Sequence, residues 1–144
     1  VFICDSHKLK TINEIKNSSV HIINFLPHKK FLDFMLKNID IGFVSLTRDY
    51  YGACIPSKIY EYINLGLPII GSLPNGDCKD IINNNNFGFT SHYDDVPSIC
   101  DAMIKLSNKK ILNFFRDKVI EERDIWSMDN KINEILNLLK SLPK

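Results

Sequence analysis

The stretch from residue 52 to residue 70, GACIPSKIYEYINLGLPII, constrains the fold most, because it places helix signals between two apolar runs. Pro56 and Ser57 are typical of a helix start, since proline is tolerated in the first turn and a serine oxygen can accept from the amides behind it. Gly66 supplies the left-handed residue that ends a helix, and Pro68 prevents the helix from restarting. The sequence therefore predicts a short helix between two buried strands, with its amino end facing a loop.

This helix is predicted to have an apolar face and a charged face. Ile59, Tyr62 and Ile63 recur at helical spacing, so one face is buried. Lys58 and Glu61 are three residues apart on another face, where side chains can meet. The free amides and positive dipole end of a helix favour a phosphate. A carboxylate at Glu61, one turn further in, is well placed to accept from the hydroxyls of a ribose, so the pattern favours a diphosphate-ribose ligand.

Strand and helix patterns alternate along most of the chain. They predict an α/β fold: a Rossmann-like parallel sheet with helices on both faces, followed by an all-helical stretch. The predicted strands cover residues 1–4, 20–25, 39–46, 69–72 and 87–91. Further helices are predicted at residues 7–16 and 29–38, from 75–77 to the asparagine run 83–86, and at 96–106, 109–122 and 128–142. No internal repeat or linker divides the chain, so a single domain is expected.

The same pattern predicts which side chains are buried. Residues 39–46, IDIGFVSL, are too uniformly apolar for a half-solvated strand, which favours a central position in the sheet. Helical spacing predicts these inward residues: Phe31, Leu32, Met35, Leu36, Ile99, Met103, Leu106, Ile111, Leu112, Phe115 and Val119. The last helix carries a stripe formed by Ile132, Ile135, Leu136, Leu139 and Leu142.

Length and charge exclude some classes of protein. The 144 residues suffice for one domain, or for half of a larger enzyme. A formal net charge of +1 gives no bulk basicity that would favour nucleic acid or an anionic membrane. No apolar run approaches the ~18 residues of a membrane span, and no signal peptide is present. The chain opens in an apolar run without a methionine, so we expect further residues upstream.

Residue types that often build metal or catalytic centres are scattered. The cysteines have no zinc-like spacing, and reduced thiols in a cytosolic protein are expected. No histidine has a serine or cysteine partner in the sequence pattern, so no catalytic triad can be recognised. These residues are Cys4, Cys54, Cys78, Cys100, His7, His21, His28 and His92. Neither a metal nor a cofactor is therefore expected.

The predicted topology points to three loops as ligand sites. In sheets of this kind, ligands bind at the carboxyl ends of the strands, near a point where strand order reverses. Residues 26–29, 47–57 and 71–76 qualify by position. The middle loop leads directly into the helix whose amino end favours a phosphate. The nucleotide site is therefore predicted at that junction.

Two motifs, PSKIYEY at residues 56–62 and GLPII at 66–70, carry a family resemblance. The chain resembles the carboxy-terminal, donor-binding half of a GT-B glycosyltransferase, close to the bacterial family-4 enzymes that build capsular and O-antigen polysaccharide. In those enzymes, P-S-K-x-Y-E-Y followed by G-x-P-I-I sits in the donor site. The resemblance covers nearly the whole chain. Comparable family signposts fall at residues 20–27, 39–46, 87–89, 102–106 and 126–127.

The resemblance implies a role for individual residues. Glu61 matches the second glutamate of the family's E-x7-E motif, which holds the donor ribose. The resemblance therefore implies a catalytic role for Glu61, in which it orients the donor. The first glutamate of that motif would fall on Ala53, which has no carboxylate. Lys58 is a candidate phosphate contact. The diphosphate-binding loop and helix start match Ile55, Pro56, Ser57 and Lys58; the base-binding segment matches Leu26, Pro27 and His28; the candidate donor-sugar loop contains Arg48, Gly52, Ala53 and Cys54.

The implied activity is retaining transfer of a sugar from a UDP- or GDP-linked donor. The acceptor would be a glycan or lipid-linked molecule, bound by an amino-terminal domain that these residues do not contain. The family's Arg/Lys pair that clamps the diphosphate would also precede this stretch. The implied location is the cytoplasm, with the full enzyme reaching the inner face of the plasma membrane. Alone, this chain is expected to bind donor weakly and to catalyse nothing.

The sequence is also compatible with other functions and other residue roles. The chain could be a non-catalytic Rossmann-like module that binds a protein or effector. It could also be half of a GT-B sugar-nucleotide epimerase, which would need catalytic carboxylates and a histidine in the other half. At the level of residues, Glu61 could be a solvated carboxylate paired with Lys58, and Ser57 could be a helix cap. Arg48 could be a solvated loop residue.

Overall fold

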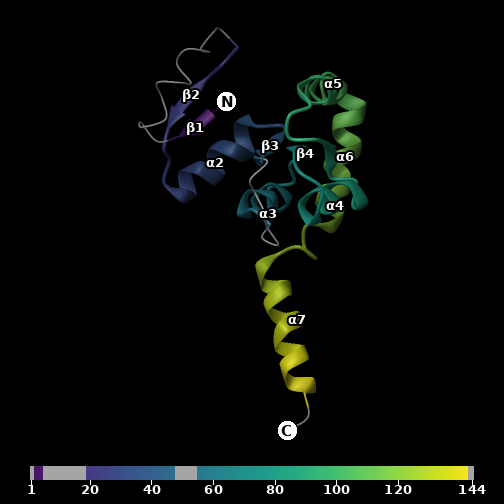
Figure 1. The fold of residues 1–144 in the computed structure, drawn as a ribbon. Coiled ribbons are helices and arrows are strands. Elements are labelled where there is room, and N and C mark those ends of the chain that lie inside the picture. Colours follow the sequence, from purple (N-terminus) through teal and green to yellow (C-terminus); the bar gives the residue numbers. More distant parts are fainter. Residues whose placement is uncertain (1, 5–18, 48–54, 143–144) are drawn as a thin grey trace. The chain divides into compact units, whose positions relative to one another are not determined.

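The computed structural model describes residues 2–4, 19–47 and 55–142, and for residues 2–4 the backbone alone (Figure 1). The chain divides into two compact units, residues 1–38 and residues 39–144. Each unit is considered by itself below. The predicted helix at residues 7–16 and most of the loop before Ile55 lie outside the described residues.

The first unit contains two parallel strands and a helix. β1 (Phe2–Cys4) pairs with β2 (Ile22–Asn24), and both strands fall inside the predicted ranges. The helix α2 (His28–Asn38) begins one residue earlier than predicted, so His28 is a helical residue and not part of a loop.

The inward face of α2 is narrower than predicted. Met35 is 5% exposed, whereas Leu36 is 61% exposed. Successive residues of a helix are about 100° apart around its axis, so a stripe centred on Met35 turns Leu36 toward solvent. The prediction that Leu36 points inward is therefore wrong.

The second unit is built on a three-stranded parallel sheet. Its strands are β3 (Gly42–Ser45), β4 (Ile69–Ser72) and β5 (Gly88–Ser91), and their spatial order is β3-β4-β5. Every residue of β4 is buried, as expected for a strand with neighbours on both sides. The parallel pairing confirms the predicted arrangement.

The strand at residues 39–46 is parallel, as predicted. β3 is an edge strand of this sheet, and its buried and exposed residues alternate. Phe43 is 44% exposed, while Val44 is 5% exposed. The apolar pattern alone does not indicate that the phenylalanine at this position is exposed.

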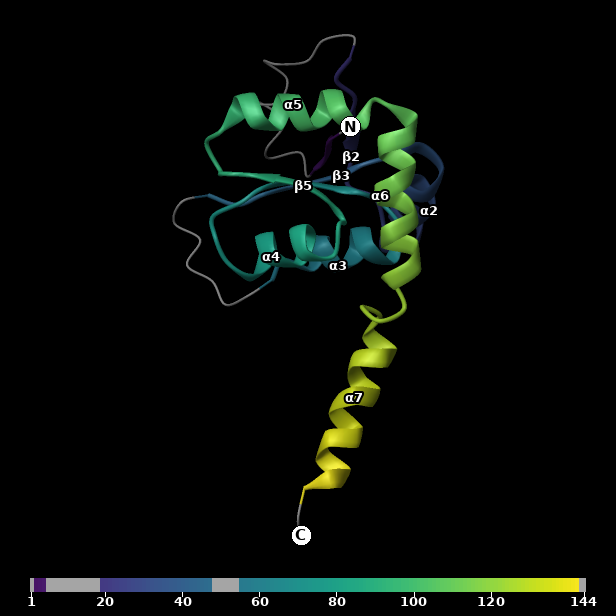
Figure 2. The ribbon, with the colours of Figure 1, turned by 90° about the vertical axis from the view of Figure 1, so that its right-hand side faces the viewer.

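Helices cover both faces of the sheet (Figure 2). α3 (Ser57–Asn64) and α4 (Asp77–Asn84) lie on one face, and α5 (Val96–Leu106) lies on the other. α6 (Lys109–Glu122) contributes to both layers, because Val119 joins the first core cluster and Phe115 joins the second. An α/β fold with a parallel sheet between helices, as predicted, is confirmed.

The buried residues form one cluster on each side of the sheet. The first cluster is centred on Ile59, Ile63, Leu73, Ile82 and Phe87, all 0% exposed. The second is Ile70, Ala102, Leu106 and Phe115. Met103, predicted inward, is 48% exposed, because Ala102 occupies the buried position of α5 instead.

Two predicted helix exits are confirmed. Gly66 has φ 71°, and its N–H donates to the Ile63 carbonyl at 2.9 Å. At the end of α4, Asn86 has φ 54°, a conformation that asparagine tolerates better than most residues. Both residues turn the chain into the next buried strand.

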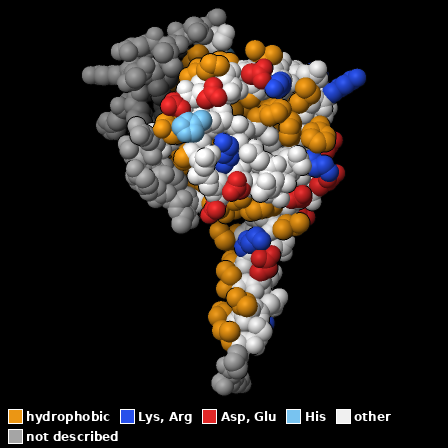
Figure 3. Space-filling view, turned by 45° about the vertical axis from the view of Figure 1, so that its right-hand side comes forward, with side chains coloured by type: hydrophobic (Ala, Val, Ile, Leu, Met, Phe, Trp, Pro, Cys, Tyr) orange, Lys and Arg blue, Asp and Glu red, His pale blue; other side chains and the backbone are white. Residues whose placement is uncertain are grey.

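The final helix, α7 (Met128–Ser141), exposes its apolar stripe. None of its side chains is buried, and Ile135 and Leu139 are 58% and 57% exposed. Figure 3 shows hydrophobic side chains along one side of this helix. No helix in the described part of the chain combines the length and apolarity needed to cross a membrane.

Replacing Asn108 by alanine is expected to lower the free energy of unfolding by about 1 kcal/mol. The Asn108 side chain caps α6, because its Oδ1 accepts from the Lys110 N–H at 2.9 Å. Urea denaturation would measure the loss, and Asn113→Ala, an exposed position within α6, is the control. Equal stabilities of the two variants would show that the cap contributes nothing.

Candidate functional site

The predicted site lies at the start of α3. Pro56 is the residue that precedes the helix, with φ −57° and ψ 135°, and it forms no side-chain capping hydrogen bond. The prediction that Ser57 caps the helix is wrong, because Ser57 is the first helical residue. A capping side chain must come from the residue before the helix, where its oxygen can reach the amides two and three positions on.

The amino end of α3 differs from those of the other described helices of the second unit. Asp95, Asn108 and Ser127 cap α5, α6 and α7 with their side chains. α4 has no such cap, but it carries Asp77 and Asp80 in its first turn. Among these described helices, only α3 has neither a side-chain cap nor an acidic residue in its first turn. No carboxylate in the first turn therefore offsets the positive end of the α3 dipole. This favours the binding of an external anion.

An ion pair occupies the exposed face of α3. The Lys58 Nζ lies 2.7 Å from the Glu61 Oε2, which confirms that the two predicted residues meet. The Lys58 side chain is 50% exposed, and the Glu61 side chain is 27% exposed. A lysine in the first turn of a helix faces the unfavourable end of the dipole, and Glu61 offsets part of this cost.

The buried face of α3 fixes these two charged residues on the sheet. Ile59 and Ile63 are fully buried. The Tyr62 ring packs so closely on β3 that a Cβ at Gly42 would lie 2.4 Å from it. The Tyr62 hydroxyl donates to the Phe43 carbonyl at 3.4 Å, and burial, with a smaller effect of the Glu61 carboxylate, raises the pKa of this tyrosine. The orientation of α3 therefore rests on packing.

The carboxyl edge of the sheet holds the neighbouring polar groups. β3 leads toward α3 and β4 leads toward α4, so both helices begin at this edge. The buried Ser72 hydroxyl donates to the Tyr93 carbonyl at 3.0 Å and ties the ends of β4 and β5 together. His92 hydrogen-bonds to Asp94, which lowers the pKa of that carboxyl.

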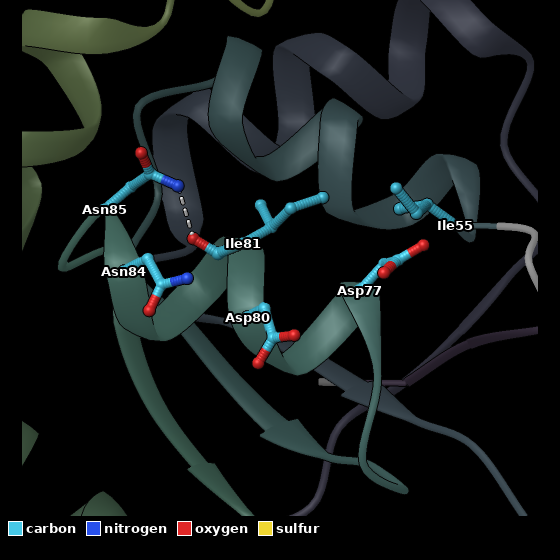
Figure 4. Close-up of a pocket in the computed structure, with 6 residues that line it drawn as sticks. All are labelled: Ile55, Asp77, Asp80, Ile81, Asn84 and Asn85. Atoms are coloured by element: carbon cyan, nitrogen blue, oxygen red, sulfur yellow. Dashed lines mark hydrogen bonds between the residues drawn. The ribbon is translucent and has the colours of Figure 1, made fainter.

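A pocket of about 320 Å³ lies between the entrance to α3 and the outer side of α4 (Figure 4). Of the predicted site residues that the structure describes, only Ile55 lines it. The carboxylates of Asp77 and Asp80 oppose a phosphate there. The remaining lining residues are Ile81, Asn84 and Asn85. Sequence reasoning missed this pocket, and the two aspartates in one helical turn were the signal that could have marked it.

The other predicted site residues are placed as follows. Ile55, Pro56, Ser57, Lys58 and Glu61 lie together in the second unit, at the start of α3. Leu26, Pro27 and His28 belong to the first unit, where the Pro27 carbonyl accepts from the Phe31 N–H at the start of α2. Arg48, Gly52, Ala53 and Cys54 lie outside the described residues.

Within the described ranges, no three side chains of His, Cys, Asp or Glu gather in a way that could hold a metal ion. Cys78 is buried and Cys100 is exposed. The side chains of Cys4 and Cys54 are outside those ranges.

The chain was compared with protein-family models, with curated protein sequences and with solved structures, and none of the three comparisons gave a match. The structure itself defines a class: an α/β protein with a parallel sheet, consistent with a Rossmann-like fold. Within that class, the start of α3 is the candidate anion site.

Proposed function

We propose that this chain is the donor-binding part of a retaining glycosyltransferase and that it binds a nucleoside diphosphate sugar at the start of α3. One observation carries the proposal. Within the described part of the chain, the amino end of α3 has no side-chain cap and no acidic residue in its first turn, and it carries Lys58, with Glu61 one turn further along. A diphosphate suits the amide end, and a carboxylate one turn away suits a ribose.

The sequence motif supports the same site, because packing explains only part of it. Ile59, Ile63 and Ile69 are 0% exposed, and Gly66 supplies the positive φ that ends the helix. Lys58 and Glu61 are the charged members of the motif, and neither is buried. Burial and turn geometry do not require a lysine and a glutamate at these two positions, whereas binding of a diphosphate and a ribose would.

The proposed chemistry is mainly electrostatic. Negative charge develops on the departing diphosphate during sugar transfer, and the amino end of α3 with Lys58 would stabilise it. Glu61 would orient the donor by accepting hydrogen bonds from its ribose, which holds the sugar in a reactive position. In this proposal an upstream domain binds the glycan or lipid-linked acceptor.

Glu61→Gln is expected to weaken the binding of UDP or GDP about 10- to 100-fold, because a hydrogen bond to a charged group contributes about 1.5–3 kcal/mol. Isothermal titration calorimetry would measure both dissociation constants. Glu121→Gln is a matched control, because Glu121 pairs with Lys118 at 2.7 Å with the same spacing on α6. Glutamine keeps the size of the side chain, and the thermal transitions of both variants should equal that of the unmodified protein.

A Glu61→Gln variant that binds the nucleotide as tightly as the Glu121→Gln control would contradict the assigned role. So would equal losses in the two variants, because a general change in surface charge would then explain the effect.

A further inference from the structure

We propose that Asn75 is a modification site: its side-chain amide is lost spontaneously through a cyclic imide formed with Gly76, and Lys79 of α4 promotes the loss. The reaction is deamidation, and its reagents are the chain itself and water. It converts a neutral side chain in the loop between β4 and α4 into a carboxylate. The inference does not depend on the proposed function, because it needs no ligand.

The sequence supplies the reacting pair. Asn75 is the one asparagine of the chain that is followed by a glycine, Gly76. In deamidation, the backbone nitrogen of the following residue attacks the asparagine Cγ, so a side chain on that residue hinders the approach. Glycine has no Cβ and reaches backbone conformations that other residues avoid. The pair at residues 75–76 is therefore the most reactive one in the sequence.

The structure leaves this pair accessible. Asn75 is exposed and lies before α4, so no helix fixes its backbone. Gly76 has φ 139°, and an added Cβ there would meet no atom within 4 Å. In the part of the chain that the structure describes, the Gly76 N–H donates to no acceptor. Neither close packing nor a hydrogen bond therefore keeps the attacking nitrogen from the Asn75 side chain.

Lys79 activates the group that is attacked. Its Nζ donates to the Asn75 Oδ1 at 3.2 Å. Negative charge develops on this oxygen when the nitrogen adds to Cγ, and a neighbouring ammonium stabilises that charge. The helix holds Lys79 in place, because Cys78 and Ile82 of α4 are buried in the first core cluster. The start of α4 therefore promotes the loss of the amide.

The steps balance without an external oxidant or reductant. The Gly76 nitrogen loses its proton to hydroxide and attacks the Asn75 Cγ, which forms an N–Cγ bond. The Cγ–Nδ2 bond breaks, and Nδ2 takes up a proton from water and leaves as ammonia. Water then opens the cyclic imide at one of its two carbonyl carbons. Opening at Cγ gives aspartate, and opening at the main-chain carbonyl carbon gives isoaspartate.

The two products differ in their effect on α4. Aspartate keeps the backbone and places a carboxylate next to the Lys79 ammonium, near the positive end of the helix dipole. Isoaspartate lengthens the backbone by one carbon between Leu73 and Cys78, which are 0% and 7% exposed. The extra carbon displaces the Gly76 carbonyl, which accepts from the Lys79 and Asp80 N–H groups at 2.9 and 3.1 Å. Isoaspartate should therefore destabilise the start of α4, and aspartate should not.

The test is to incubate the whole chain at mildly alkaline pH, folded and in parallel in urea, and to follow residue 75 by mass spectrometry. Digestion at acidic pH prevents further deamidation, and fragmentation identifies aspartate and isoaspartate separately. Both products should accumulate at residue 75, while the asparagines at 83–86, which no glycine follows, keep their amides. Over the same period, Asn75→Gln and Gly76→Ala should show no change at residue 75.

Lys79→Met separates activation from simple exposure. In the folded chain it should slow the reaction about two- to fivefold, the range that a surface charge interaction supports. In urea the same variant should react as fast as the unmodified protein, because α4 no longer holds the lysine beside Asn75. Lys118→Met is the matched control, because Lys118 pairs with Glu121 on α6, and it should leave both rates unchanged.

Three results would overturn the proposal. A folded chain that keeps the Asn75 amide while the chain in urea loses it would mean that the fold protects the pair. Loss of the amides at residues 83–86 as fast as at residue 75 would mean that Gly76 does not direct the reaction. An equal rate for the folded Lys79→Met and Lys118→Met variants would mean that α4 does not promote it.

Discussion

Replacing Gly88 by alanine is expected to unfold the second unit. Gly88 opens β5 opposite Ile69 of the central strand, and its φ is 155°, a conformation that other residues rarely adopt. A Cβ at this position would lie 1.9 Å from the Ile69 carbonyl oxygen. The obstacle is backbone of a fully buried strand and cannot rotate away, so we expect a loss of at least ~3 kcal/mol.

Circular dichroism and urea denaturation would measure the effect of Gly88→Ala. Gly76→Ala is the matched control, because Gly76 has φ 139° but an added Cβ there meets no atom within 4 Å. The control therefore carries the backbone strain without the clash and should be folded, with a loss of roughly 1–3 kcal/mol. Similar losses for the two variants would contradict the close approach of β4 and β5 at Gly88.

Phe87→Ala is expected to cost about 3–5 kcal/mol, the range for removing a large aromatic side chain from a core. Phe87 is 0% exposed and belongs to the core cluster that packs α3 and α4 on the sheet. Its ring meets the Trp126 ring edge-on, with centroids 6.1 Å apart, and Tyr60 of α3 lies 6.2 Å from the same tryptophan. The cavity would therefore loosen the helix that carries Lys58 and Glu61.

The fluorescence of Trp126, the single tryptophan of the chain, reports this change directly. We expect Phe87→Ala to shift the emission to longer wavelength and to lower the urea midpoint. Phe114→Ala is the control, because Phe114 is 51% exposed on α6. A Phe87→Ala variant as stable as this control would mean that the cluster on that face of the sheet is packed differently.

The sequence predicted best where the signals are local. The helix after Pro56, the positive φ of Gly66 and the strand Ile69–Ser72 each follow from residues within a few positions of one another. The meeting of Lys58 with Glu61 is equally local, because helical spacing alone brings them together. These elements contain the candidate site, which is why the positions of Lys58 and Glu61 could be predicted.

The errors arose where tertiary context decides. Within the second unit β3 is the outer strand, which the sequence could not indicate because strand order depends on contacts distant in sequence. Leu36 was predicted to point inward and is exposed. The pocket beside α4 was missed because it brings Ile55 near Asp77 and Asp80, which are separated from Ile55 in the sequence by α3 and β4. A hydrophobic pattern indicates a face, but not what covers that face.

The most direct test of the donor site is an NMR titration of the amide signals of the whole chain with UDP and, separately, GDP. A donor site predicts saturable shifts at residues 55–61, and shifts at residues 26–28 that differ between the two bases. The signals of α6 around Glu121 serve as the internal reference. Saturable shifts that spare residues 55–61, or no shifts at millimolar nucleotide, would contradict the donor site at the start of α3.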